Sequence, residues 1–94
     1  GTFLLAYAEA ITLFSAYSAR IVQALETGTG EPHAELLAAK RRILQDIQRA
    51  IDWALQHYRQ GEISTRQARL QSKLLMELRD VTALMYRVHR VYFG

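Results

Sequence analysis

The sequence predicts an all-α protein, in which a single domain of residues 1–94 forms an antiparallel up-down-up bundle of three helices. The chain has one Pro and is rich in Ala, Leu, Gln and Arg, which favour helix. Apolar residues recur at spacings of three and four, the period of a helix with one buried face. Two glycine-containing breaks, near residue 28 and at residue 61, separate three long stretches, and short connections between long helices produce antiparallel neighbours.

The first helix is predicted at about residues 2–26, where residues 3–25 contain no Gly or Pro. Its apolar side chains spread around most of the circumference, which is typical of a helix buried in a core or in a membrane. Glu9 lies inside the run and Arg20 ends it before about 20 apolar residues are reached, so no membrane span is expected. A signal peptide is disfavoured because no basic residue precedes the apolar stretch. We expect this helix to be buried within protein.

The second helix is predicted at about residues 32–60. Gly28 and Gly30 suit the left-handed conformations that end a helix, and Pro32 suits the first turn of the next one. The residues expected to face inward are Leu36, Leu37, Ile43, Leu44, Ile47, Ala50, Ile51, Ala54, Leu55 and Tyr58.

The third helix is predicted at about residues 65–92. Gly61 breaks the second helix, and Ser64 followed by Gln67 has the pattern of a capping box with Ser64 at the N-cap. The seam expected to face inward consists of Leu70, Leu74, Leu78, Val81, Leu84, Met85, Val88 and Tyr92.

These three helices carry more apolar surface than they can bury against one another, because much of the first helix has no partner and the third ends in Val91-Tyr92-Phe93. Large exposed apolar patches usually mark an interface. We therefore expect oligomerisation to complete the bundle, most simply as a symmetric homodimer through the first helix. The alternative is a monomer cut from a larger protein, whose further helix covers the patch. The predicted partner-binding residues are Phe3, Tyr7, Phe14, Tyr17, Val88, Tyr92 and Phe93.

Basic residues are the strongest surface signal. Residues 1–35 contain one basic and four acidic residues, whereas residues 36–94 contain eleven basic and five acidic ones. Stripes of cations can bind phosphates or steer an acidic partner, although the interspersed acidic residues also fit an ordinary solvated face. The predicted basic surface consists of Lys40, Arg41, Arg42, Arg66, Arg69, Lys73, Arg87 and Arg90.

No catalytic residue, metal site or cofactor is predicted. The absence of Cys excludes disulfides, thiolate nucleophiles and cysteine zinc sites, and it leaves the compartment unmarked apart from a preference for the cytoplasm. His33, His57 and His89 have no His, Asp or Glu at the spacing of a metal site, so we expect them to face solvent. Glu9 is expected on an exposed stripe or in an ion pair with Arg20.

Two families offer partial resemblances. The segment Arg49-Ala50-Ile51-Asp52 resembles a fragment of the Arg-x-x-Ile-Asp pattern of the all-α chorismate mutases, although here it falls in the second helix and not the first. That resemblance implies a dimeric three-helix enzyme whose arginines hold a dicarboxylate. Residues 74–80 resemble flagellar and type III export chaperones, which implies binding of apolar helices. Neither resemblance assigns the chain to a family.

The function expected from the sequence is that of a non-enzymatic helical adaptor or chaperone-like module, which binds itself or an amphipathic partner helix. One alternative is a nucleic-acid-binding accessory protein that uses the basic face of the second and third helices. The other is a small all-α enzyme of the chorismate-mutase type.

Overall fold

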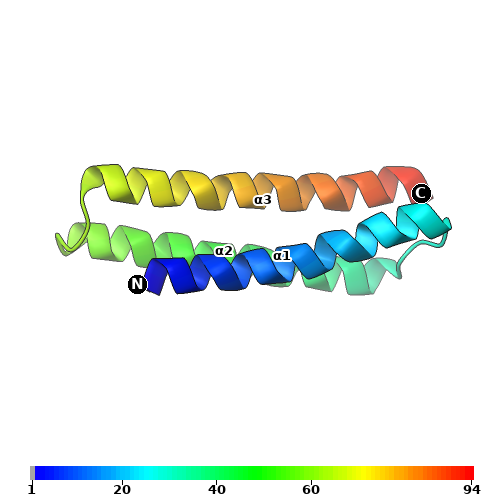
Figure 1. Cartoon of the computed structure of the whole chain (residues 1–94), viewed down its shortest axis with the longest axis horizontal. Helices are drawn as coiled ribbons and strands as arrows, with labels where there is room; N and C mark the ends of the chain where they lie inside the picture. The colour runs from blue at the N-terminus through cyan, green and yellow to red at the C-terminus, as the bar shows by residue number, and fades with distance from the viewer. Residues whose placement is uncertain (1) are drawn as a thin grey trace.

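Three long helices make up the fold. The computed structural model describes residues 2–94, so that Gly1 lies outside the described residues, and it contains α1 (Thr2–Thr27), α2 (His33–Arg59) and α3 (Thr65–Phe93). They form a rod of 50 × 19 × 19 Å in which α1 and α3 run in the same direction and α2 runs opposite to both (Figure 1). All three pairs of helices are in contact. The predicted all-α, antiparallel three-helix architecture is confirmed.

The helix ends follow the local signals of the sequence. Gly28 and Gly61 adopt positive φ angles of 75° and 74°, the left-handed conformation that ends a helix at little cost for glycine. The Ser64 side chain accepts a hydrogen bond from the Gln67 N–H, and the Gln67 side chain accepts one from the Ser64 N–H. The predicted capping box is therefore present.

Gly30 has a different role from the one predicted. Its φ angle is not positive, but a Cβ atom there would lie 2.9 Å from Cγ of Phe93. Gly30 therefore allows the end of α3 to pack against the loop between α1 and α2.

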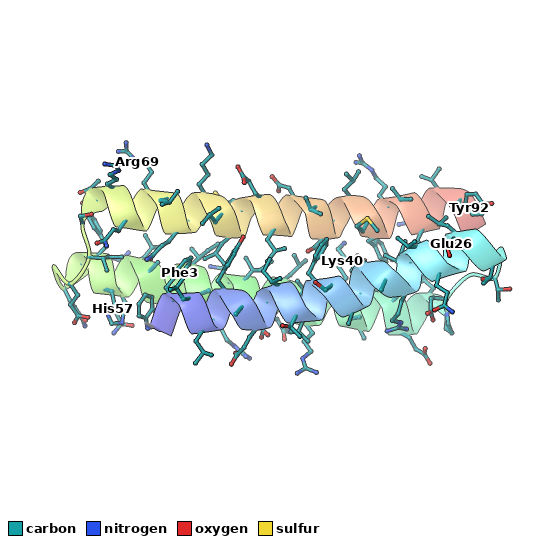
Figure 2. The ribbon with its side chains drawn as sticks, in the orientation of Figure 1. Phe3, Glu26, Lys40, His57, Arg69 and Tyr92 are labelled. Carbon is teal, nitrogen blue, oxygen red and sulfur yellow. The ribbon has the colours of Figure 1, made fainter. Side chains whose placement is uncertain are left out.

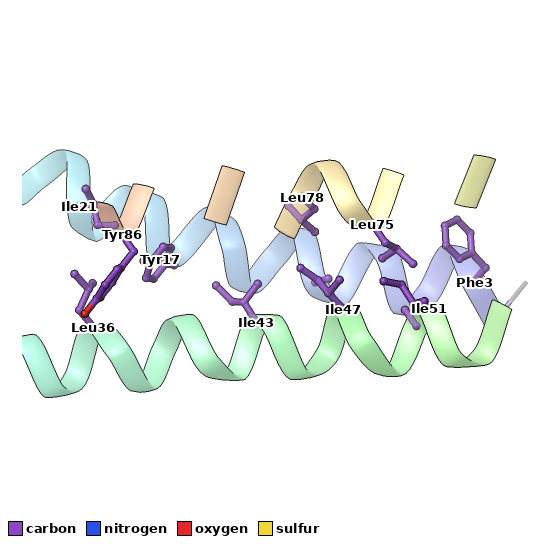
Figure 3. Packing of buried hydrophobic residues seen from close by; sticks show 12 residues of the cluster. Phe3, Tyr17, Ile21, Leu36, Ile43, Ile47, Ile51, Leu75, Leu78 and Tyr86 are labelled. Carbon is purple, nitrogen blue, oxygen red and sulfur yellow. The ribbon is translucent and has the colours of Figure 1, made fainter. Parts of the chain in front are cut away.

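The core is a column of apolar side chains along the axis of the rod (Figure 3). α2 packs with the predicted face, since its buried residues all belong to the predicted set. The core cluster consists of Phe3, Ala10, Tyr17, Ile21, Leu36, Ile43, Ile47, Ala50, Ile51, Leu75, Leu78 and Tyr86.

α3 packs with a face other than the predicted seam, of which only Leu78 is buried. The residues that α3 buries are Ala68, Leu75, Leu78, Thr82, Tyr86 and His89. Two of these are polar, and both are satisfied: Thr82 Oγ1 donates to the Leu78 carbonyl, and His89 Nε2 accepts the Glu31 N–H. The inward seam predicted for the third helix is therefore wrong for most of its length, as is the prediction that His89 faces solvent.

None of the helices within residues 2–94 combines the length and the apolar character needed to cross a membrane.

Candidate protein-interaction surface

A row of apolar side chains that the bundle leaves uncovered follows the length of α3. We call it the outer stripe; its residues alternate at spacings of four and three, and they are Leu70, Leu74, Glu77, Val81, Leu84, Val88 and Val91. Apart from Glu77 and the half-buried Leu74, its members are apolar and exposed, from 38% for Val88 to 79% for Val91. At 100° per residue the outer stripe lies about a third of the circumference away from the buried face of α3.

The spacing of the outer stripe is that of a coiled-coil heptad. Val81 and Val88 occupy a positions, and Leu70 and Leu84 occupy d positions. β-branched residues at a with Leu at d favour two-stranded packing, in which each side chain inserts between four residues of the facing helix. The chemistry of the outer stripe therefore suits contact with one further helix.

The C-terminal half of the outer stripe borders an open apolar groove. The ends of α1 and α3 lie side by side at one end of the rod (Figure 1). The groove is lined by Leu25, Leu84, Arg87, Val88, Val91 and Tyr92. Since Leu25 belongs to α1, a helix seated there would contact both α1 and α3.

The predicted partner-binding residues of α1 lie mostly inside the bundle. Phe3 and Tyr17 are buried in the core, so a partner would contact them only if the bundle opened. Tyr7 and Phe14 are half-buried and pack against the core. The large apolar residues that α1 exposes are Leu4, Leu5 and Val22.

The predicted aromatic residues at the end of α3 have two different environments. Tyr92 is 63% exposed and lines the groove together with Val88. The Phe93 ring lies against Gly30 and 4.7 Å from the His89 ring, measured between centroids. Tyr92 is thus accessible to a partner, whereas Phe93 holds the loop between α1 and α2.

The basic run on α2 does not form one surface. Lys40 Nζ lies 4.4 Å from the centroid of the Tyr86 ring, a cation–π contact with α3. Arg42 lines grooves between α1 and α2 beside Asp46, and Arg41 is exposed. The three cations diverge because consecutive helical residues point about 100° apart.

The basic residues of α3 are exposed. Arg66, Arg69 and Lys73 lie in its first turns, and Figure 2 shows Arg69 projecting away from the bundle. Arg87 and Arg90 are exposed near its other end. In heptad terms Arg66, Lys73, Asp80 and Arg87 occupy the g positions that flank the outer stripe.

A polar network fixes the loop between α1 and α2, and the sequence pattern did not reveal it. The Arg20 guanidinium donates to both carboxylate oxygens of Glu31, with two N–O distances of 3.2 Å. This bond holds the pKa of the Glu31 carboxyl below its usual value. Glu31 also donates its N–H to His89 Nε2 at 3.0 Å. Of the two alternatives expected for Glu9, the exposed position is the one found, because Arg20 pairs with Glu31 instead.

The polar residues inside the bundle serve its packing. Thr82 and His89 are buried, and both bond to backbone groups. The Tyr17 hydroxyl is buried without a hydrogen-bond partner among residues 2–94, and burial raises its pKa to about 12, with a smaller contribution from Tyr86. In the described part of the chain, no group of three or more His, Asp or Glu side chains could hold a metal ion.

Comparison of the chain with protein-family models, with curated proteins and with solved structures found no match. The function is therefore inferred from the surface of this bundle.

Proposed function

We propose that the chain is a non-enzymatic protein-interaction module, which binds another helix along the outer stripe of α3. The observation that carries this proposal is a heptad of exposed Leu and Val residues on a helix that already buries a different face. The three-helix core is formed without the outer stripe, so its own packing gives these side chains no role. Exposed apolar surface gathered on one face in this way is typical of interaction sites.

The cations beside the outer stripe favour a partner helix that carries acidic residues. Arg66, Lys73 and Arg87 are exposed at flanking positions, where side chains of a bound helix would come within reach. A partner with acidic residues at its own flanking positions would associate faster and in a defined orientation. Asp80 interrupts the row. Its carboxylate lies 3.6 Å from Arg79 of the same helix and stays largely exposed, so a cation of the partner can also pair with it at that level.

Site-specific photo-crosslinking in the native cell tests the proposal. A photoreactive amino acid is placed at Leu84, which is exposed and lines the groove, or at Gln48, which is exposed on α2. Leu84 is expected to give discrete protein adducts that Gln48 does not give, either to further copies of this chain or to another protein. If Leu84 gave no adducts beyond those of Gln48, the proposed function would be refuted.

Nucleic-acid binding is the second candidate, favoured by the exposure of Arg66, Arg69 and Lys73 along two turns of α3. Binding through such a cluster would be insensitive to sequence and would weaken steeply with salt. A triple substitution of these residues to Glu should then abolish binding of a duplex in a mobility-shift titration. Unchanged affinity in the triple variant would exclude this surface as the nucleic-acid site.

A further inference from the structure

We infer that the helix bound by the outer stripe is α3 of a second copy of this chain, running antiparallel, with Asp80 of each copy facing Arg87 of the other. This inference rests on the proposed function and specifies its partner. The contact would form around a two-fold axis that passes between residues 82 and 83.

From Leu74 to Val91, the apolar residues of the outer stripe fit this register, whereas Leu70 would face a position outside residues 2–94. In an antiparallel pair an a position of one helix packs opposite a d position of the other. With Val81 opposite Leu84 of the second copy, Leu74 comes opposite Val91, and two-fold symmetry repeats both pairs. These pairs of facing residues extend along the groove, where Leu84, Val88 and Val91 are exposed in the single chain.

Charge complementarity selects this register. In an antiparallel pair the g positions of the two helices flank the same side of the contact. With Val81 opposite Leu84, Asp80 and Arg87 of opposite copies come within about 3 Å of each other along the axis. The symmetry makes two such pairs of opposite charge, and charges at these positions determine the partner and orientation in coiled coils. Asp80, which is 3.6 Å from Arg79 in its own chain, thereby gains a second cation from the other copy.

Other registers bring like charges together. If the second copy slides by one heptad in one direction, Asp80 of one copy faces Asp80 of the other. If it slides by one heptad in the opposite direction, Arg87 faces Arg87. A parallel pair in register would place Glu77 against Glu77 at a d position and would leave Asp80 beside Met85. Like charges placed together disfavour these arrangements.

Glu77 is compatible with the antiparallel pair. It comes opposite Val88 of the second copy, where its aliphatic stem can pack and its carboxylate can stay at the hydrated edge. A polar residue at one core position of a coiled coil lowers stability and fixes the register. Glu77 would therefore weaken the parallel pair, in which two Glu77 side chains face each other, more than the antiparallel pair inferred here.

Charge exchange tests the pairing in the purified chain. Sedimentation equilibrium should show a dimer for the wild type, and Asp80→Arg or Arg87→Asp alone should weaken dimerisation at least about tenfold. An equimolar mixture of these two variants should dimerise as tightly as the wild type. In the mixed dimer one chain carries arginine at both positions and the other carries aspartate at both, so each of the two contacts again joins opposite charges. Arg41→Asp, which makes the same charge change on α2, should leave dimerisation unaltered.

The orientation is measured with spin labels, which the absence of native Cys permits. Labels attached at Arg69→Cys would be separated along the axis by about 40 Å in the antiparallel dimer, but by only about 10–15 Å in a parallel one. A short distance, a wild type that stays monomeric, or no recovery in the mixture would each overturn the inference. Crosslinks from Leu84 to a different protein would still support the proposed function in any of those cases. The absence of Leu84 crosslinks to any protein, copies of this chain included, would refute both.

Discussion

Replacing Tyr17 with Phe is expected to stabilise the bundle. Tyr17 is 2% exposed, and its hydroxyl has no hydrogen-bond partner within the described residues. A buried polar group without a partner costs about 1–3 kcal/mol, since it loses its bonds to water on folding. Phe fills the same space without the hydroxyl. We therefore expect Tyr17→Phe to raise the free energy of unfolding by about 1 kcal/mol.

Tyr86→Phe is the matched control because it removes the same oxygen from a tyrosine that has a partner. The Tyr86 hydroxyl lies 3.1 Å from His33 Nε2, so its removal should lower the free energy of unfolding by about 1 kcal/mol. Urea denaturation followed by circular dichroism measures both variants at pH 7. If Tyr17→Phe lowered the free energy of unfolding as Tyr86→Phe does, the Tyr17 hydroxyl would have a partner and the reasoning would be refuted.

The pH dependence gives the same prediction a second readout. The pKa of Tyr17 is raised from its usual 10.0 to about 12 in the folded chain. Between these two values the unfolded chain has lost the Tyr17 proton while the folded chain retains it, so the stability of the wild type falls as pH rises. Tyr17→Phe lacks this loss. Between about pH 10 and pH 12, the difference in free energy of unfolding between Tyr17→Phe and the wild type should therefore grow by about 1 kcal/mol per pH unit.

Three further substitutions test other contacts, each by denaturation experiments. Ser64→Ala removes the N-cap of α3 and should lower the free energy of unfolding by about 1 kcal/mol; an unchanged value would show that this cap does not stabilise the fold. Gly30→Ala would place Cβ 2.9 Å from Cγ of Phe93, so the free energy of unfolding should fall by about 1–3 kcal/mol. In a chain that already carries Phe93→Ala, the same substitution should cost less. Equal costs in the two backgrounds would contradict the contact. Because Arg20 lowers the pKa of Glu31 in the folded chain, their bond contributes stability above about pH 4.5 that is lost as pH falls through the lowered pKa. Glu31→Gln should remove this part of the fall in the free energy of unfolding at low pH. If the variant lost stability with falling pH as steeply as the wild type, the ion pair would not contribute.

The helix ends could be predicted from the sequence because their determinants are local. The capping box joins Ser64 to a residue three positions away, and Gly28 ends α1 by donating to Ala24 four positions before it. All six helix ends lie within one residue of the predicted positions. Contacts of such short range depend on residue type and spacing alone.

The inward face of α3 could not be predicted in the same way. Hydrophobic periodicity identifies the more apolar stripe, and on α3 that stripe faces outward. The buried face includes Thr82 and His89, which are tolerated because each has a hydrogen-bond partner. The partner of His89 is the Glu31 N–H, 58 positions away. No local pattern reveals such a contact, so the sequence assigned Leu84 and Val88 to the core.

The composition of the outer stripe supports the proposal that another helix covers it. Valine favours helix less than alanine does by about 0.5 kcal/mol, so Val81, Val88 and Val91 weaken α3 while they face solvent. Their side chains add little to the three-helix core, and they enlarge the apolar surface in contact with water. A facing helix offsets both effects, since β-branched residues at a positions pack well between the two helices of a coiled coil. α3 thus has room for two seams: a partly polar one that holds its own bundle together, and an apolar one that is stabilising only when a second helix covers it.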